Sequence, residues 1–345
     1  MSKIKVIKQK NKTTGATRFV KESVKGSRIF DKVIPTPTPL PVANSGLIII
    51  KNTNGIILAW SGKQATIDLV NGGVLKHLGT PDQNLVNTYD LGRYNGASIY
   101  SNPEPYHING KAEHISFVSA SWNPVQAGDA GFNPSKVLES SWNATTGEYY
   151  AKTRPQQWKF TDSVPEPECL FETWYKPILG TTAIQVRQRV SLSRTGGQIH
   201  NGKALELPFG MFDRNLESLI TYTGNAPFTG AATQSISYDY AAFGQPNTAA
   251  YVNGSEHWAA LVRADGQGVG LVIPRILDGN GNVLQTGRTD FRANKYLNAD
   301  GSQNPMMYLQ SPDTYNDMGN NVIDKTYYWV LGTTEQIRAF AVSVH

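Results

Sequence analysis

The sequence of 345 residues has one cysteine, Cys169, no run of 18 apolar residues and no convincing helical periodicity. A single cysteine excludes an internal disulfide, and no Cys/His spacing resembles a zinc site, so we expect neither a metal nor a cofactor. Cys169 is expected to be a packing residue. The lack of a long apolar run excludes a membrane-spanning helix. The basic opening MSKIKVIKQKNKTTG leads into no apolar segment, which predicts no Sec signal peptide and synthesis in the cytoplasm.

Charged residues are also scarce, at 17% of the chain, and they are unevenly distributed. Residues 1–45 hold ten Lys and Arg against Glu22 and Asp31, a local balance of +8, which leaves −3 of the total of +5 for residues 46–345. A slightly acidic body predicts no nucleic-acid surface, because such a surface needs a basic patch on the folded domain. The basic character belongs to an N-terminal arm.

That arm ends in PTPTPLPVA, residues 35–43, where alternating prolines favour an extended spacer and prevent a helix. Two interpretations remain open: a solvated, flexible tail, or a docking segment that becomes ordered against another subunit. We expect an arm and linker over residues 1–45 and one domain over residues 46–345. Other subunits of an assembly are the expected partners of the arm.

The body has the features of a β protein. Apolar, β-branched runs at 47–50, 56–60 and 65–70 are separated by Asn-Gly pairs at 54 and 71, a strong hairpin signal. Further candidate strands are 114–121, 148–153, 168–176, 182–193, 218–223, 257–264, 268–273 and 326–343. In 182–193 the segment Arg187-Gln188-Arg189 shifts the alternation, which predicts a bulge and arginines that are exposed or paired across strands.

Helical candidates such as residues 133–139 amount to single turns. So many strands in one chain predict an all-β fold, in which two large antiparallel sheets pack face to face. The sandwich would be larger than an immunoglobulin-like unit. We expect it to form a single domain.

Several segments resemble a known family. ATIDLVNGGVLKHLG and NTYDLGRYNGASIY resemble the start of galactose-mutarotase-like supersandwich domains, and WNPVQAGD, KTRPQQW and HWAALVRADGQGVGLVIP resemble uncharacterised bacterial β-sandwich proteins of that type. The resemblance covers residues 46–343 and implies a supersandwich with a carbohydrate in its concave face. It selects no activity, because such domains include epimerases, polysaccharide lyases, non-catalytic parts of glycoside hydrolases and binding modules.

Catalysis would require groups that converge, and the spacing shows no convergence. An epimerase needs a general acid and a general base, for which the weak candidates are His107, His200 and Glu206. A lyase needs a base and an enolate stabiliser, for which Arg93, Arg154, Tyr100 and Tyr106 are chemically suitable. A glycosidase needs two carboxylates, which could come from Asp90, Asp129, Glu172 and Glu206.

Sugar binding without catalysis needs only an aromatic platform beside planar polar groups. The segment SASWNPVQAGDAGFNPS, residues 119–135, supplies both, and its two Asn-Pro pairs exclude a helix. We predict a ligand-binding groove with one side formed by this loop and the other by KTRPQQW, while a purely structural turn is the alternative. The predicted ligand-binding residues are Trp122, Gln126, Asp129, Arg93, Arg154 and Trp158. Trp174 and Trp329, within apolar strands, are expected to lie in the core.

Together these features predict a non-catalytic structural or glycan-recognising β-sandwich protein. It would dock through residues 1–45 into a larger assembly, such as a phage particle, a tail-like apparatus or a surface layer, with a polysaccharide as a second partner. The basic arm and the lack of an identifiable catalytic constellation favour this reading. The alternative is a carbohydrate-active enzyme, an epimerase or a polysaccharide lyase, on the same scaffold.

Overall fold

The computed structural model describes residues 46–99, 122–158, 163–193, 206–236, 250–294 and 322–345 with their side chains, together with Leu309, Ser311 and the backbone of further short strands. The chain divides into two compact units, Met1–Thr38 and Pro39–His345. In the first unit, strands β1 (Val6–Lys10), β2 (Thr17–Glu22) and β3 (Arg28–Ile29) form an antiparallel meander. An extended arm was predicted here, and these strands were not. The β-branched and aromatic residues of VIKQK and TRFVKE favour them.

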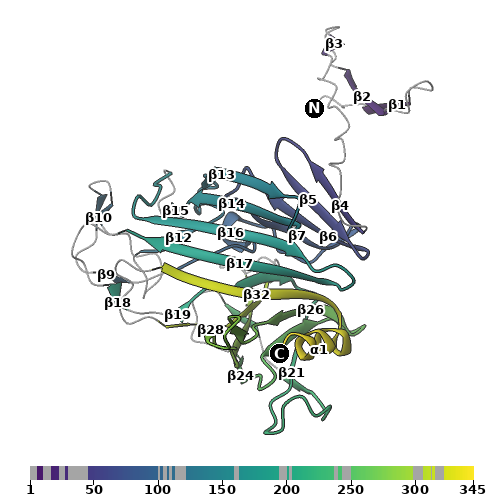
Figure 1. The fold of residues 1–345 in the computed structure, drawn as a ribbon. Helices are drawn as coiled ribbons and strands as arrows, with labels where there is room; N and C mark the ends of the chain where they lie inside the picture. The colour runs from purple at the N-terminus through teal and green to yellow at the C-terminus, as the bar shows by residue number, and fades with distance from the viewer. Residues whose placement is uncertain are drawn as a thin grey trace. The chain divides into compact units, whose positions relative to one another are not determined.

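The second unit is built on a nine-stranded antiparallel sheet (Figure 1). Each strand alternates inward and outward side chains, so one face can be buried while the other meets solvent. In spatial order the strands are β13 (Lys136–Asn143), β14 (Glu148–Arg154), β16 (Cys169–Pro177), β17 (Ala183–Leu192), β32 (Val322–Thr333), β26 (Gln267–Val272), β25 (Trp258–Val262), β21 (Ser218–Thr221) and β22 (Gln234–Ile236).

The bulge expected at Arg187-Gln188-Arg189 is absent. Strand β17 pairs with β16 and with β32 in continuous register through all three residues. The prediction was wrong because Gln188, although polar, takes an inward position and is 1% exposed, so the alternation continues unbroken. The arginines on either side face outward and pair across the sheet with Asp324, as predicted.

Two five-stranded sheets complete the framework. One is the meander predicted from the Asn-Gly pairs, with strands β4 (Leu47–Lys51), β5 (Gly55–Trp60), β6 (Lys63–Asp68), β7 (Val74–Thr80) and β8 (Gln83–Asn84). The other contains β20 (Phe209–Asp213), β30 (Met306–Gln310), β29 (Asp290–Leu297), β23 (Tyr240–Ala242) and β24 (Ala250–Asn253). In the second sheet β23 runs parallel to β29, and the other pairs are antiparallel.

Short strand pairs and one 3-10 turn, η1 (Leu91–Arg93), connect the larger sheets. The pairs are β9 (Asn102–Pro103) with β18 (His200–Asn201), β10 (His107–Ile108) with β11 (Lys111–Ala112), β12 (Pro124–Val125) with β15 (Gln156–Gln157), β19 (Ala204–Leu205) with β31 (Asp313–Thr314), and β27 (Ile276–Leu277) with β28 (Val283–Gln285). The candidate strand at 114–121 lies outside the described residues.

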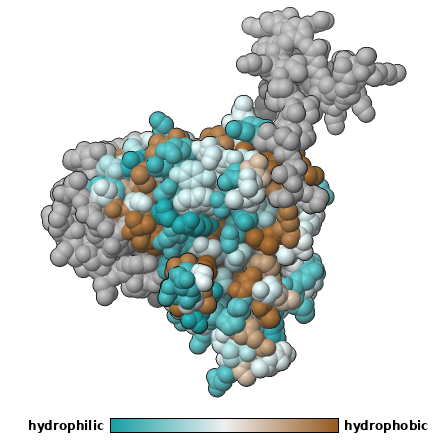
Figure 2. Space-filling model, viewed as in Figure 1, coloured by the Kyte–Doolittle hydropathy of each residue, from teal (hydrophilic) through white to brown (hydrophobic). Residues whose placement is uncertain are grey.

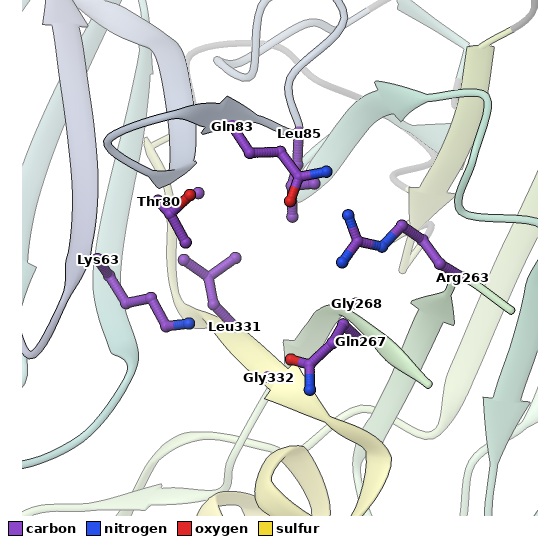
Figure 3. Close-up of a pocket in the computed structure, with 10 residues that line it drawn as sticks. Lys63, Thr80, Gln83, Leu85, Arg263, Gln267, Gly268, Leu331 and Gly332 are labelled. Atoms are coloured by element: carbon purple, nitrogen blue, oxygen red, sulfur yellow. The ribbon is translucent and has the colours of Figure 1, made fainter. Parts of the chain in front are cut away.

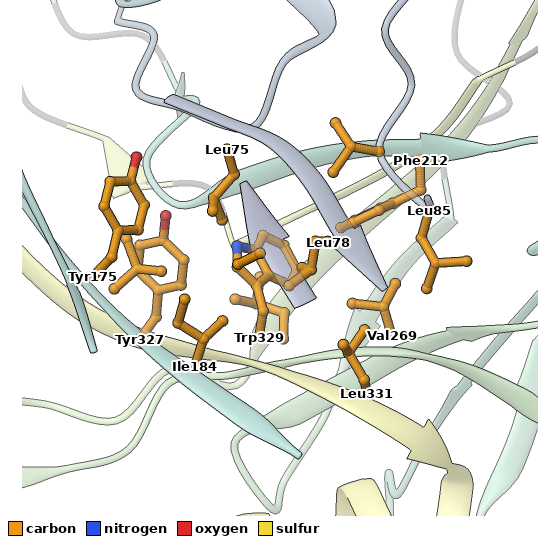
Figure 4. Packing of buried hydrophobic residues seen from close by; sticks show 14 of the residues in the cluster. Leu75, Leu78, Leu85, Tyr175, Ile184, Phe212, Val269, Tyr327, Trp329 and Leu331 are labelled. Carbon is orange, nitrogen blue, oxygen red and sulfur yellow. The ribbon is translucent and has the colours of Figure 1, made fainter. Parts of the chain in front are cut away.

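The inner face of the nine-stranded sheet packs against both five-stranded sheets through one large hydrophobic core. Figure 4 shows Leu75 and Leu78 of β7 over Trp329 and neighbouring residues of the large sheet. Phe212 of β20 meets Trp329 edge-on, with ring centroids 5.1 Å apart. The chain is therefore an all-β protein built as a large antiparallel sandwich, which confirms the predicted fold class.

The C-terminal segment differs from the prediction, because the candidate strand at 326–343 ends at Thr333 and is followed by helix α1 (Thr334–Ser343). Thr333 and Gln336 form a capping box, in which the Thr333 hydroxyl accepts from the Gln336 amide and the Gln336 side chain accepts from the Thr333 amide. Ile337 and Phe340 pack the helix onto the outer face of β25, β26 and the end of β32. No helix in the described part of the chain has the length and apolarity needed to cross a membrane.

Candidate functional site

The two segments predicted to form a groove are neighbours in the structure. Strand β12, in the loop of residues 122–135, pairs with β15 of KTRPQQW. The Trp158 amide donates to the Asn123 carbonyl at 2.9 Å, and the Ala130 amide donates to the Trp158 carbonyl at 2.7 Å. These bonds hold the segments directly against each other.

The loop's three predicted ligand contacts are buried. Trp122 and Gln126 are both 0% exposed, and Asp129 is 1% exposed. The Trp122 indole N–H donates to Glu166 at 2.8 Å, the Gln126 amide donates to the Gly72 carbonyl at 3.0 Å, and Asp129 accepts from the Asn133 amide at 2.9 Å. Buried polar groups need such partners, and here the loop and its neighbours supply them. A ligand-binding role for these residues stays a prediction, and their burial argues against it.

The remaining predicted ligand-binding residues are also tied into the framework. Arg93 is buried with its Nε 3.1 Å from Asp90 Oδ2, and burial lowers the pKa of Arg93. Arg154 donates to the backbone carbonyls of Glu166, at 3.2 Å, and Pro167. The Trp158 ring is so close to Gly92 that a Cβ there would lie 2.5 Å from it. These contacts fix the chain around the loop.

The structure describes only some of the candidate catalytic groups. The side chains of His107 and His200 lie outside the described part, as do Tyr100 and Tyr106. Glu206 is half-buried, and its carbonyl accepts from the Ser98 amide at 3.4 Å. Among the side chains that the structure describes, no group of three His, Cys, Asp or Glu residues could hold a metal. Catalysis therefore stays untested.

A second group of aromatic and charged side chains lies on the outward face of β14, β16, β17 and β32. One cross-strand row runs through Tyr150, Trp174 and Arg187, and the next row runs through Glu172, Arg189 and Asp324. These six residues are called the outer cluster below. Figure 2, in the same view as Figure 1, shows hydrophilic and intermediate residues across the middle of this face.

The aromatic part of the outer cluster is held by cations. The rings of Tyr150 and Trp174 lie 5.1 Å apart and are tilted by 39°. The guanidinium carbons of Arg187 and Arg189 lie 4.9 and 5.5 Å from the centroid of the Trp174 ring. Such cation–π contacts orient the indole on the sheet surface.

Hydrogen bonds fix the polar part of the outer cluster. Arg187 donates two hydrogen bonds to Asp324, of 2.9 and 2.6 Å, and Arg189 Nε donates to the same carboxylate at 3.0 Å. The Tyr150 hydroxyl donates to Glu172 at 2.8 Å. The side chains of Arg187, Arg189 and Asp324 are 42, 34 and 31% exposed, so a ligand at this face can reach them.

Burial and hydrogen bonds shift the pKa values of three members of the outer cluster, Tyr150, Asp324 and Arg187. Burial, followed by the hydrogen bond to Glu172, raises the pKa of Tyr150, so its hydroxyl remains a donor at neutral pH. Burial also acts to raise the pKa of Asp324, but the hydrogen bonds from Arg187 and Arg189 outweigh it and lower that pKa overall. The bond to Asp324 raises the pKa of Arg187. The outer cluster thus pairs two arginine side chains, Arg187 and Arg189, with two acidic side chains, Glu172 and Asp324.

The outer cluster was not predicted from the sequence, because Trp174 was expected to lie in the core. In β16 the inward positions are taken by Cys169, Phe171, Thr173 and Tyr175, so strand alternation turns Trp174 outward. Trp329 does lie in the core, as predicted. The outward position of Trp174 could have been predicted from the strict alternation of apolar and other residues in CLFETWY, which places Trp174 on the same face of the strand as Glu172.

Comparison with known proteins finds a likeness in fold. No protein-family model and no curated protein matches the chain. The chain is similar to a galactose mutarotase-like protein from Clostridium acetobutylicum, at 9% identity over 84% of this chain and 100% of that chain, with a TM-score of 0.37. It is also similar to a mutant of a heparan sulfate lyase from Pedobacter heparinus, at 9% identity over 87% of this chain and 37% of that chain, with a TM-score of 0.39. A third similar structure is an alpha-galactosidase from Geobacillus stearothermophilus, at 10% identity over 84% of this chain and 42% of that chain, with a TM-score of 0.43. Such identities and TM-scores support no statement about activity.

Proposed function

We propose that the protein is a glycan-recognising β-sandwich that binds a polysaccharide through the outer cluster. The observation that carries this proposal is the half-buried indole of Trp174, set between Tyr150 and two arginines on an open face of the sheet. An aromatic ring supplies the apolar surface for the C–H face of a sugar, and planar polar groups beside it take the hydroxyls.

The charge balance indicates which sugars fit. The two cations are matched by two carboxylates, and both arginines are already bonded to Asp324. A polyanion would have to displace Asp324 or lie beside Glu172, which like-charge repulsion disfavours. The outer cluster therefore suits a neutral, hydroxyl-rich polysaccharide.

Preorganisation supports binding at this face. Ion pairs and cation–π contacts already hold the arginine and indole side chains in place, so less side-chain entropy is lost when a ligand binds. Helix α1 covers a different part of the same outer face and leaves the outer cluster uncovered by any described element. The site thus needs no rearrangement of the sheet.

An array of neutral and acidic polysaccharides tests the proposal. We expect the wild-type protein to bind neutral members and Trp174→Ala to lose most of that binding. The matched control is Tyr251→Ala, since Tyr251 is another exposed aromatic residue with an arginine, Arg292, 5.5 Å from its ring centroid. Equal losses for the two variants, or no binding by the wild type, would contradict the proposal. New reducing or unsaturated ends in the polysaccharides after incubation with the protein would contradict the proposal that it binds them without catalysis.

We further propose that residues 1–45 dock the protein into a larger assembly. The charge segregation supports this, because ten basic residues lie in a segment that precedes a slightly acidic body. Deletion of residues 1–43 should abolish incorporation into that assembly or reduce the oligomer size measured by light scattering. Unchanged incorporation and unchanged oligomer size would refute the docking role. They would not bear on the proposal that the outer cluster binds a polysaccharide.

A further inference from the structure

A small hollow lies apart from the outer cluster, where two sheets approach each other. It has a volume of about 60 Å³ and is bordered by the ends of β6, β7 and β8, the β25–β26 hairpin and the end of β32. Gly332, at its edge, follows Asp324 by eight residues of β32, which is about 26 Å along a strand. A ligand of the outer cluster would therefore have to be long to reach it.

Polar side chains from three segments converge on this hollow. Figure 3 shows the ends of Lys63, Gln83 and Arg263 turned toward one open centre, with Leu85 and Leu331 beside them and Gln267 at the edge of the hollow. Within the described part of the chain, the side chains of Lys63, Gln83 and Gln267 make no hydrogen bond to another residue. Their donors remain available to a ligand.

Arg263 is only partly engaged. Its Nε and Nη2 atoms lie 3.3 and 2.9 Å from the two oxygens of Asp265, in the turn that joins β25 to β26. The Nη1 atom is outside this pair. Asp265 is 57% exposed and is absent from the lining of the hollow, whereas the Arg263 side chain is 21% exposed and lines it. Both charged residues that border the hollow, Lys63 and Arg263, are cations.

We propose that this hollow binds a small oxyanion, such as the carboxylate or sulfate group of an acidic ligand. A cavity needs about 10 to 15 Å³ to admit one water molecule, so about 60 Å³ accommodates a group of several heavy atoms. Charge-assisted bonds from Lys63 and Arg263 would hold the anion, and the amide group of Gln83 would donate to one of its remaining oxygens. The inference is independent of polysaccharide binding at the outer cluster.

Calorimetric titration at constant ionic strength tests this site. The probes are sulfate, phosphate, acetate and glucuronate, with chloride and glucose as controls. We expect saturable binding of at least one oxyanion by the wild type and no saturable binding of chloride or glucose. Lys63→Gln should weaken oxyanion binding by about tenfold, since it removes one charge-assisted hydrogen bond. Arg263→Gln should act in the same direction.

The matched control is Lys136→Gln, because Lys136 is an exposed lysine on β13, outside the lining of the hollow. This variant should bind the oxyanions as the wild type does, and thermal unfolding should show that all three variants are folded. The proposal is overturned if the wild type binds no oxyanion, if chloride binds equally well, or if Lys63→Gln and Lys136→Gln behave alike. Tighter binding of glucuronate than of acetate would identify the anion as sugar-borne, and equal binding would identify a free oxyanion. Either result supports the site.

Discussion

Trp122 and Trp174 lie on opposite sides of the nine-stranded sheet. Trp122 is fully buried and packs with inward-facing residues such as Phe171 and Val190, while Trp174 stands on the outward face among charged side chains. Both occur in segments that mix apolar and polar residues. The loop around Trp122 uses its amides and carboxylates to satisfy its own buried polar groups, whereas the outer cluster leaves its groups accessible. Accessibility, and not composition, separates a structural loop from a binding surface.

Removing each of the two tryptophans should have its largest effect on the stability of the protein. Trp122→Ala should lower the free energy of unfolding by about 3 to 5 kcal/mol, because it leaves a cavity in the core. Trp174→Ala should cost about 1 kcal/mol, since only cross-strand surface contacts are lost. Urea unfolding followed by circular dichroism measures both. Similar losses for the two variants would contradict the assignment of Trp122 to the core and Trp174 to the surface.

Glu166, which accepts a hydrogen bond from Trp122, tests the structural role of the buried loop. Its carboxylate is 1% exposed and accepts from the Trp122 indole, the Gln157 amide at 2.6 Å and the Glu168 backbone amide at 2.9 Å. Glu166→Gln replaces one acceptor with a donor that faces other donors, and should cost about 1 to 3 kcal/mol. The matched surface change Glu172→Gln should cost less, and equal losses in urea unfolding would argue against a structural role for Glu166.

Tyr150→Phe tests the outer cluster with a minimal change. It removes the hydroxyl that donates to Glu172 and keeps the ring beside Trp174. The free energy of unfolding should fall by about 1 kcal/mol or less, because the bond is part-buried. Polysaccharide affinity should fall only a few-fold, since the stacking surface persists. If Tyr150→Phe lost binding as completely as Trp174→Ala, the Tyr150 hydroxyl would be as important for recognition as the Trp174 ring, contrary to this prediction.

The smallest expected effect concerns pH. The pKa of Asp324 is lower in the folded protein than its usual value of about 3.9, so its stabilisation is fully present above that value and is lost as the pH falls through the folded pKa. Asp324→Asn should therefore destabilise the protein by less than about 1 kcal/mol at pH 7. The difference from wild type should narrow as the pH falls below the usual carboxyl pKa and close once the pH is below the folded pKa of Asp324. A difference in urea unfolding that persists unchanged at low pH would show that Asp324 acts through packing.

Local patterns in the sequence were sufficient for much of the fold. Asn-Gly pairs located the hairpins of the first five-stranded sheet, and alternation located most strands of the large sheet. Helix α1 was missed although the sequence TTEQ contains its capping box, because the apolar strand before it runs directly into the helix.

The site could not be predicted in the same way. Which side of a strand meets solvent depends on what packs against each face, and that requires the partner sheets. Trp174 was consequently assigned to the core, although strand alternation turns it outward. The pairing of Arg187 and Arg189 with one Asp324 depends on the non-local neighbour β32. The hollow beside Lys63 likewise joins segments that are about 200 residues apart in sequence.

The most direct test of the comparison is a calorimetric titration of one array-identified neutral polysaccharide into Trp174→Ala and Trp122→Phe, beside the wild type. Trp122→Phe keeps an aromatic ring in the core and removes the indole N–H that donates to Glu166. We predict that Trp174→Ala remains folded and loses binding, whereas Trp122→Phe is less stable and binds with wild-type affinity. The reverse result, binding retained by Trp174→Ala and lost by folded Trp122→Phe, would contradict the outer cluster as the recognition site and return that role to the loop.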